Sequence, residues 1–168
     1  MDNNKELSNI EETNKILQLV RFRVGSEQYG LDILRVLEII RMPPITRVPQ
    51  APPIIDGVIN LRGRVIPIIN TRRRFGLEEK ESDSDSRIVI VEISGDHVGL
   101  VVDAVQEVLR IQQTSVEAPP QLAHGAEYIS GISRLDDSLL ILLDLTELAA
   151  EAAEVTLEAN RIREGHSG

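Results

Sequence analysis

A long internal repeat is the feature that most constrains what this chain can fold into. The segment GVINLRGRVIPIIN, which begins at Gly57, is matched later in the chain by GISRLDDSLLILLD, which begins at Gly131, with the glycine, the leucine and the apolar run in register. Upstream, a series of positions pairs at one constant offset, namely Val20, Phe22, Gly25, Tyr29, Gly30, Leu31, Val36, Glu38 and Ile39 with Val89, Val91, Ser94, Val98, Gly99, Leu100, Val105, Glu107 and Val108. A duplication predicts two similar modules, and their junction is a natural groove for a partner.

Length and composition limit the class of protein. With 168 residues and 42% apolar content, the chain can form one sizeable core or two small cores that share an interface. The sequence has no cysteine, which excludes a disulfide framework and a thiolate metal site. No segment approaches the roughly 20 apolar residues of a membrane span. We therefore expect a soluble, cytoplasmic protein that does not insert directly into a membrane.

Charge is distributed unevenly between the two repeats. The formal net charge is −9 at pH 7, and three segments outside the repeats carry this whole excess. Residues 17–77 hold ten arginines against four carboxylates, whereas residues 86–146 hold nine carboxylates against three arginines. Net charges of +6 and −6 could pair head to tail with a similarly built partner. Chance divergence of two solvated surfaces is an equally good interpretation.

Periodicity and turn residues predict many short strands. The alternation of apolar and polar residues from Leu17 to Val24 is typical of a strand with one buried face, and Tyr29 to Ile33 reads as its hairpin partner. Prolines bracket a short edge strand at Ile45 to Val48. Val65 to Ile69 reads as a buried strand. The segment from Ile33 to Ile40 could be a strand or a bent connection.

These elements predict an all-β fold with little helix. We expect two pseudo-symmetric, five-stranded β-barrels of the SH3-like or OB-like kind, plus a C-terminal helix that begins near residue 145. The expected boundaries are a flexible lead at 1–16, a first barrel repeat at 17–77, an acidic linker at 78–86, a second barrel repeat at 87–150 and an acidic, partly helical tail at 151–168.

A search for catalytic chemistry gives little. His97, His124 and His166 lack metal-ligand spacing and are interpreted as surface imidazoles in loops. The sequence contains neither a phosphate-binding glycine motif nor a nucleophile elbow. The pair Asp136 and Asp137 fits a solvated turn better than paired catalytic carboxylates. The run Arg72–Arg74 could bind phosphate or form a solvated helix face, but four aromatic residues leave no stacking platform for nucleic acid.

One charged residue does stand out. Arg62 lies in the segment NLRGR between a glycine-containing strand and a buried strand, and Gly57 and Gly63 permit a tight backbone there. A guanidinium on such a rigid base suits bidentate recognition of a partner's carboxylate. A structural salt bridge, for instance to Glu38, explains the residue almost as well.

Several segments together resemble the CheW family of chemotaxis coupling proteins. They are YGLDI from Tyr29, VLEI from Val36, ITRVP from Ile45, the repeat segment from Gly57, and VGLVVDAV from Val98. The resemblance extends from about residue 17 to residue 150 without long gaps. NLRG before a VIPI strand is the most specific of these motifs.

The resemblance implies an adaptor of two β-barrels, without enzymatic activity or cofactor, that links methyl-accepting chemoreceptors to the histidine kinase CheA. In the family, the cytoplasmic hairpin tip of the receptor lies in the groove between the subdomains. The matching positions here are Val36, Glu38, Ile39, Arg62, Val105 and Val108. The family's subdomains also join the homologous regulatory domain of the kinase in rings, and Glu117 and Leu122 are the candidates for that contact.

Two alternatives remain open at this stage. The chain could be a CheW-like module redirected to a chemosensory pathway other than motility, or a module of a larger protein of that family. It could also be a ligand-binding or catalytic double barrel that uses the groove between its modules. A groove lined by valine and isoleucine with one arginine and one glutamate is poorly suited to acid–base catalysis.

Overall fold

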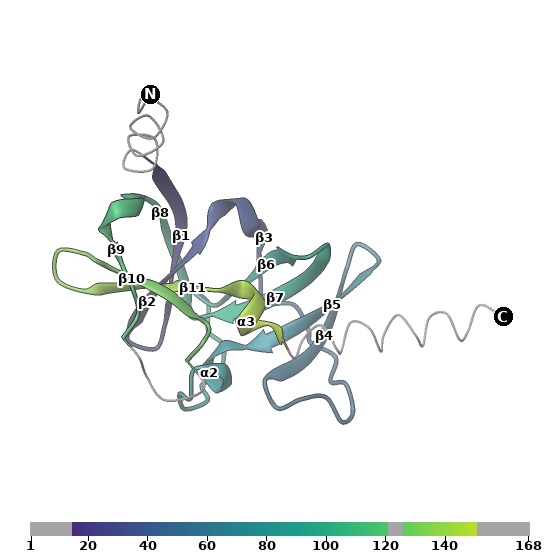
Figure 1. The fold of residues 1–168 in the computed structure, drawn as a ribbon. Coiled ribbons are helices and arrows are strands. Elements are labelled where there is room, and N and C mark those ends of the chain that lie inside the picture. Colours follow the sequence, from purple (N-terminus) through teal and green to yellow (C-terminus); the bar gives the residue numbers. More distant parts are fainter. Residues whose placement is uncertain (1–14, 121–125, 151–168) are drawn as a thin grey trace.

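The computed structural model describes residues 15–120 and 126–150, which form two β-sheets and a few short helices (Figure 1). The first sheet has the strand order β8 (Ala104–Gln112), β1 (Ile16–Val24), β2 (Glu27–Asp32), β11 (Leu139–Leu143), β10 (Ile129–Arg134) and β9 (Val116–Glu117). The second has the order β3 (Val36–Arg41), β6 (Arg87–Ile93), β7 (Asp96–Val102), β5 (Arg64–Asn70) and β4 (Ile55–Leu61). The expected all-β class with two sheets is confirmed.

Short helices connect these strands. The single-turn helices η1 (Ile33–Arg35) and η2 (Gln113–Ser115) follow β2 and β8, whereas α2 (Thr71–Arg74) follows β5 and α3 (Leu145–Leu148) follows β11. The undecided segment Ile33 to Ile40 is therefore a turn of 3-10 helix that leads into β3. The C-terminal helix begins at the predicted place, and the tail from residue 151 lies outside the described residues.

The two repeats exchange strands, so the expected division into one barrel from 17–77 and another from 87–150 is wrong. The hairpin β1–β2 of the first repeat pairs with β8 and β11 of the second, whereas β3 and β5 of the first pair with β6 and β7 of the second. A single residue, Asp103, separates β7 from β8. A hairpin needs a loop of about two residues, so β8 cannot fold back on β7 and enters the other sheet.

Strand registers repeat in the way that the sequence repeat predicts. In β1–β2, Phe22 faces Tyr29, and their counterparts in the second repeat, Val91 and Val98, face each other in β6–β7. The irregularities recur as well, because the β1–β8 ladder shifts between Val20 and Phe22 and the β3–β6 ladder shifts between Val36 and Glu38. Each sheet is therefore the pseudo-symmetric counterpart of the other, apart from the extra two-residue strand β9.

The largest hydrophobic core lies between the two sheets. Within the described residues, this shared core contains 15 buried residues, whereas the interior of the second sheet contributes five and that of the first sheet three. Side chains alternate between the two faces of a strand. In β6, Ile88 and Ile90 point to the interior of their own sheet, whereas Val89 and Val91 point to the shared core. Because the shared core is the largest, the two halves depend on each other to fold.

All four aromatic residues of the chain form one column through this core. Phe22, Tyr29, Phe75 and Tyr128 stack in that order, with centroid separations of 5.7, 4.6 and 5.1 Å. Burial raises the pKa of Tyr29 to about 12, with smaller effects from Tyr128 and Glu27. The column joins β1 and β2 to α2 and to the segment that precedes β10, and so contributes to holding the exchanged elements together.

A charged cluster fixes the crossover between the sheets. Asp103 accepts bonds from the Gly25 amide at 2.8 Å and from Nη2 of Arg72 at 2.5 Å, and its own amide donates to the Arg23 carbonyl. Burial raises the pKa of the Asp103 carboxyl, but the hydrogen bonds from Arg72 and Gly25 and the charges of Arg72 and Arg23 outweigh it. The pKa therefore lies below its ordinary value.

One predicted strand is reduced to a single bridge. The segment Ile45 to Val48 was expected to be an edge strand, but Thr46 alone pairs with Val58 of β4. Prolines on both sides of the segment lack the amide hydrogen that a longer ladder needs. The predicted edge strand is therefore wrong in its length, because the structure has a single bridge there.

The crossover yields a prediction of stability. We expect Asp103→Asn to lower the free energy of unfolding at pH 7 by about 1 to 3 kcal/mol, because Arg72 loses its partly buried partner. Asp137→Asn, in an exposed turn, is the control and should change it by less than about 0.5 kcal/mol. Urea denaturation measures both values, and equal values would show that the cluster contributes nothing.

The depressed pKa of the Asp103 carboxyl also determines how the stability of the protein changes with pH. Because its folded pKa is depressed, Asp103 contributes stability above its unfolded pKa of about 3.9, and this contribution disappears as pH falls from there through the folded pKa. The difference in unfolding free energy between wild type and Asp103→Asn should therefore shrink below about pH 4. A difference that stays constant down to pH 2.5 would contradict this assignment.

Candidate functional site

The candidate site is built on a tight turn between β4 and β5. Leu61 and Arg64 close a two-residue loop in which Arg62 and Gly63 both have positive φ, 52° and 84°. Oδ1 of Asn60 accepts a hydrogen bond from the Gly63 amide at 2.9 Å. A turn of this form normally has asparagine or glycine at its first central position, so an arginine there occupies a strained backbone conformation.

Arg62 extends from this turn to Glu38 on β3. Nη1 donates to Oε1 of Glu38 at 3.2 Å, and Nη2 donates to Oε2, so the contact is bidentate. The hydrogen bond from Arg62 lowers the pKa of Glu38 and, together with the charge of Arg62, outweighs the opposing effect of desolvation. Since β3 and β4 are the two edge strands of their sheet, the ion pair connects edges that no backbone ladder joins. The predicted salt bridge is therefore present.

The pair remains accessible to a partner. The side chain of Arg62 is 70% exposed and that of Glu38 is 34% exposed. An ion pair with this exposure contributes little to stability, because water screens it. Its position on a rigid turn nevertheless presents a fixed guanidinium at the surface, so a structural salt bridge and a recognition site are compatible here.

Four apolar candidates form two pseudo-symmetric pairs on β3 and β8. Val36 and Val105 are partly buried and pack against the shared core. Ile39 and Val108 are 41% and 48% exposed, although each lies opposite a buried valine on the neighbouring strand, Val89 and Val20 respectively. Figure 1 shows β3 and β8 in the same upper half of the molecule. The structure therefore places an exposed aliphatic side chain next to the shared core in each half.

A surface hollow of about 320 Å³ adjoins the ion pair. Its lining consists of Leu37, Glu38, Leu61, Arg62, Arg64, Ile66, Ile90 and His97. Sequence reasoning had identified two of these eight as site residues. His97 lies on β7, so its interpretation as a loop residue is wrong. Comparison of the repeats could have drawn attention to the hollow, because Ile90 aligns with Arg21 and Leu37 aligns with Gln106 when the repeats are superposed.

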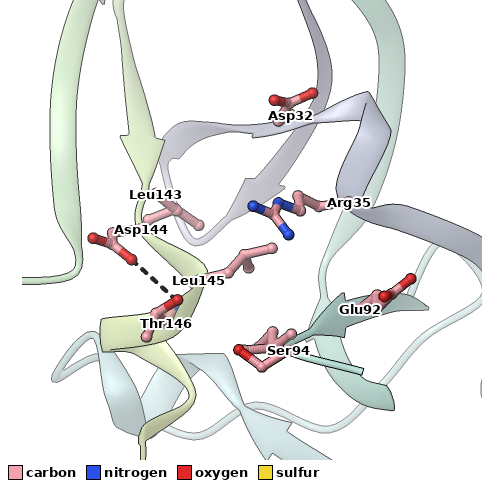
Figure 2. A pocket seen from close by; sticks show the side chains of 9 residues that line it. Asp32, Arg35, Glu92, Ser94, Leu143, Asp144, Leu145 and Thr146 are labelled. Atoms are coloured by element: carbon pink, nitrogen blue, oxygen red, sulfur yellow. Dashed lines mark hydrogen bonds between the residues drawn. The ribbon is translucent and has the colours of Figure 1, made fainter. Parts of the chain in front are cut away.

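A second hollow, of about 250 Å³, lies where both sheets meet α3 (Figure 2). Figure 2 shows the Arg35 guanidinium pointing inward from the helix η1, with Asp32, Glu92 and Asp144 around the margin. Two of these carboxylates have structural partners: Asp32 accepts from the Leu34 amide, and Asp144 accepts from the Thr146 and Glu147 amides. They cap the first turns of η1 and α3, which accounts for their presence.

The arginine run on α2 is structural, so neither phosphate binding nor a simple solvated face describes it. Arg72 bonds to Asp103 with only 17% of its side chain exposed. Arg73 pairs with Glu79 and Asp56, and donates to the carbonyl of Pro53. Arg74 stacks on the Tyr128 ring at 4.7 Å and donates to the carbonyls of Glu147 and Leu148 at the end of α3.

The residues predicted to contact a kinase fall at one edge of the first sheet. Glu117 belongs to β9, is exposed, and pairs with Nε of Arg134 at 3.0 Å. Leu122, like His124 and His166, lies outside the described residues. Asp136 and Asp137 form an exposed turn between β10 and β11, in agreement with the interpretation as a solvated turn.

Two further kinds of feature are absent from the described residues. No cluster of three or more histidine, cysteine or acidic side chains has the geometry to hold a metal ion in that part of the chain. Among the helices of residues 15–120 and 126–150, none has the length and apolar content needed to span a membrane.

Comparisons with known proteins now identify relatives. The profile of the CheW-like domain matches residues 18–153. A chemotaxis protein CheW of Treponema pallidum is 39% identical over 137 residues, which cover 78% of this chain and 81% of the relative. The corresponding protein of Helicobacter pylori is 34% identical over 139 residues, which cover 82% and 84%. The crystal structure of the scaffolding protein TtCheW from Thermoanaerobacter tengcongensis has a TM-score of 0.75 and 41% identity, covering 80% of this chain and 92% of that one.

The β4–β5 hairpin provides a test that separates strain from packing. We expect Arg62→Asn to leave the melting temperature unchanged or to raise it by up to about 2 °C, because asparagine adopts positive φ readily and the lost ion pair is exposed. Gly57→Ala, in the same hairpin, should destabilise by about 2 kcal/mol or more, since its Cβ would lie 2.1 Å from the Thr46 carbonyl oxygen. Thermal unfolding followed by circular dichroism measures both, and a large loss with Arg62→Asn would show that the ion pair is structural.

Proposed function

Because the chain belongs to the CheW family and is a chemotaxis adaptor, we propose that it couples transmembrane chemoreceptors to the regulatory domain of the histidine kinase CheA without catalysing a reaction. It would act in the cytoplasm, recruited to receptor arrays at the membrane. The relatives are named chemotaxis proteins, and the solved structure is named a scaffolding protein.

The observation that carries the receptor half of the proposal is the exposed Glu38–Arg62 pair beside exposed aliphatic residues. Ile39 on β3 and Val108 on β8 are half-exposed, and Val36 and Val105 on the same two strands pack against the shared core. Interfaces typically combine a buried aliphatic centre with a few oriented charges, and arginine is a frequent contributor to binding energy. These six residues are the proposed binding surface for the receptor tip.

The kinase half of the proposal rests on the edge position of β9 and on an exposed charge there. Glu117 is exposed at the edge of the first sheet, and Leu122 follows shortly after it in the sequence. The net charges of +6 and −6 belong to residues 17–77 and 86–146, whose strands are exchanged between the sheets, so they do not form two oppositely charged ends. A head-to-tail contact with a homologous domain would instead use exposed charges such as that of Glu117. We propose Glu117 and Leu122 as part of that contact.

Titration calorimetry against the CheA regulatory domain tests the proposed function directly. We expect saturable binding that weakens as salt is raised from about 50 to 500 mM, because screening acts on charges that meet across an interface. Absence of binding at both salt concentrations would contradict the kinase half of the proposal. An affinity that does not depend on salt would show that exposed charges such as Glu117 do not contribute to the contact.

Arg62→Glu tests the receptor surface. We expect binding of a receptor cytoplasmic fragment to weaken about tenfold or more, because a carboxylate would replace the guanidinium that faces the partner. The melting temperature should stay within about 2 °C of wild type. The control Arg134→Glu reverses an arginine of similar exposure, 74% against 70%, on the other sheet and should bind the fragment normally.

A charge swap separates recognition from structure. In the double variant Glu38→Arg with Arg62→Glu, the ion pair can form again with its polarity reversed. If the pair serves only to join β3 to β4, the swap should restore binding. We expect binding of the receptor fragment to stay weak, because the reversed charges at positions 38 and 62 would no longer complement the charges of the receptor.

Val108→Asp tests the aliphatic part of the same surface. Since Val108 is 48% exposed, we expect the variant to keep its circular dichroism spectrum and to lose at least about tenfold in affinity for the receptor fragment. An unfolded variant would show that Val108 belongs to the core. A folded variant with normal affinity would remove Val108 from the binding surface.

A further inference from the structure

The hollow beside Arg62 has a counterpart in the other half of the molecule. When the repeats are superposed, its lining of Leu37, Glu38, Leu61, Arg62, Arg64, Ile66, Ile90 and His97 corresponds to Gln106, Glu107, Leu135, Asp136, Ser138, Leu140, Arg21 and Gln28. Matching registers in both sheets make these positions equivalent in space as well as in sequence. The pseudo-symmetry thus allows one half to serve as a reference for the other.

In the first sheet, an arginine side chain occupies this place. Nη1 of Arg21 donates to Glu107 at 2.9 Å, Nε of Arg21 donates to Gln28 at 3.1 Å, and only 21% of the Arg21 side chain is exposed. Three of the eight equivalent positions are therefore tied together by one guanidinium on a long aliphatic stem. The stem covers apolar surface, while the charged end stays hydrogen-bonded.

In the second sheet, isoleucine replaces that arginine. Ile90 is 1% exposed and ends in the interior of the sheet, so it cannot extend across the mouth as Arg21 does. The cation that neutralises Glu38 comes instead from the rim, from Arg62 on its turn. The result is a hollow with a buried floor of Ile66 and Ile90, each 1% exposed, whose solvent-exposed apolar surface comes from Leu37 and Leu61 at its side.

The rim of the hollow carries an excess positive charge. Glu38 and Arg62 neutralise each other, whereas Arg64 has no hydrogen bond or ion pair with any described residue. A ligand with an aliphatic group to pack against Leu37 and Leu61 and a carboxylate for Arg64 would complement both parts. The volume of about 320 Å³ exceeds the roughly 150 Å³ that accommodates a benzene ring in a protein cavity, so a branched aliphatic side chain fits.

We propose that this hollow receives one aliphatic side chain of the receptor segment, flanked by a carboxylate that pairs with Arg64. The proposal rests on the proposed function, because it assigns the occupant to the partner that contacts Glu38 and Arg62. It adds a pocket and a second cation, Arg64, to a surface otherwise defined by the groove residues. The aliphatic side chain supplies affinity by covering the exposed parts of Leu37 and Leu61, and the carboxylate supplies specificity.

A small probe tests the chemistry of the hollow without any partner. The probe is 4-methylpentanoate, which joins a leucine-like group to a carboxylate, and its neutral match is 4-methylpentanamide. In titrations followed by amide ¹H–¹⁵N spectra, we expect shifts centred on Leu37, Leu61 and Ile90, with the acid binding at least about threefold tighter than the amide. Arg64→Gln should abolish this preference.

Opposite results in that titration would overturn the proposal. Shifts centred elsewhere, or no saturable shifts up to about 20 mM, would show that the hollow does not accept the group; eight heavy atoms can reach millimolar affinity in a suitable site. Equal binding of acid and amide would remove the role of Arg64.

A plugging variant tests the hollow in the full complex. Leu37→Trp places a large side chain at the mouth of the hollow, and Leu139→Trp is the matched control because the two leucines are 44% and 45% exposed. We expect Leu37→Trp to weaken binding of the receptor fragment about tenfold, with Leu139→Trp within about twofold of wild type. Circular dichroism verifies folding, and Leu37→Phe provides a smaller plug should the larger one not fold.

The outcomes separate this inference from the proposed function. If Leu37→Trp binds the receptor fragment normally while Val108→Asp does not, the hollow is unused and the adaptor function stands. If Leu37→Trp instead weakens binding to the CheA regulatory domain alone, the receptor is not the occupant and the inference fails. If wild type does not bind the receptor fragment, the receptor half of the proposed function fails first, and the occupant proposed here fails with it.

Discussion

The ion-paired crossover at Asp103 is the constraint on which the rest of the fold depends. One residue separates β7 from β8, so the chain must pass from one sheet to the other at this point. The carboxylate there is held by Arg72 from α2, by the Gly25 amide from the β1–β2 turn and by the charge of Arg23. These three groups belong to the first repeat, whereas Asp103 belongs to the second. A charge that is desolvated and fully partnered fixes one arrangement and penalises others, and the exchanged sheets and their shared core follow from it.

The sequence repeat predicted the strands well but not their partners. The constant spacing between matched positions anticipated equal registers in the two sheets, and the structure repeats even the ladder shifts at Val20 to Phe22 and Val36 to Glu38. Periodicity indicates which face of a strand is buried, but it does not indicate what covers that face. The pattern around Val89 would be the same if the residue faced its own barrel or a neighbouring one. The exchange depended on the length of the link at Asp103, which hydrophobic patterning does not contain. For the same reason the shared core could not be located in advance.

At the candidate site, the sequence predicted the charged pair Arg62 and Glu38 but not the hollow beside it. The glycines around Arg62 indicated a rigid turn, and the Glu38 partner named for it is present. The surrounding hollow was missed because its floor is made of ordinary core isoleucines, Ile66 and Ile90, from strands that are distant in sequence. Arg72–Arg74 show the converse case. A cationic run read in isolation suggests a binding patch, whereas each of these arginines bonds to an element that follows it in the chain, Asp103, Glu79 or the end of α3.

The duplication also explains how one fold can present two different surfaces. Both halves keep an acidic residue at the same position, Glu38 and Glu107, and each neutralises it with an arginine. In the first sheet the arginine lies on β1 and crosses the mouth, so its aliphatic stem covers the opening. In the second sheet the arginine lies on the β4–β5 turn, so the same charge is balanced while Leu37 and Leu61 stay partly exposed in the hollow. An arginine on the turn, in place of one on the strand, therefore still neutralises the glutamate but leaves the hollow open. Such a change makes equivalent positions of a pseudo-symmetric frame present different surfaces.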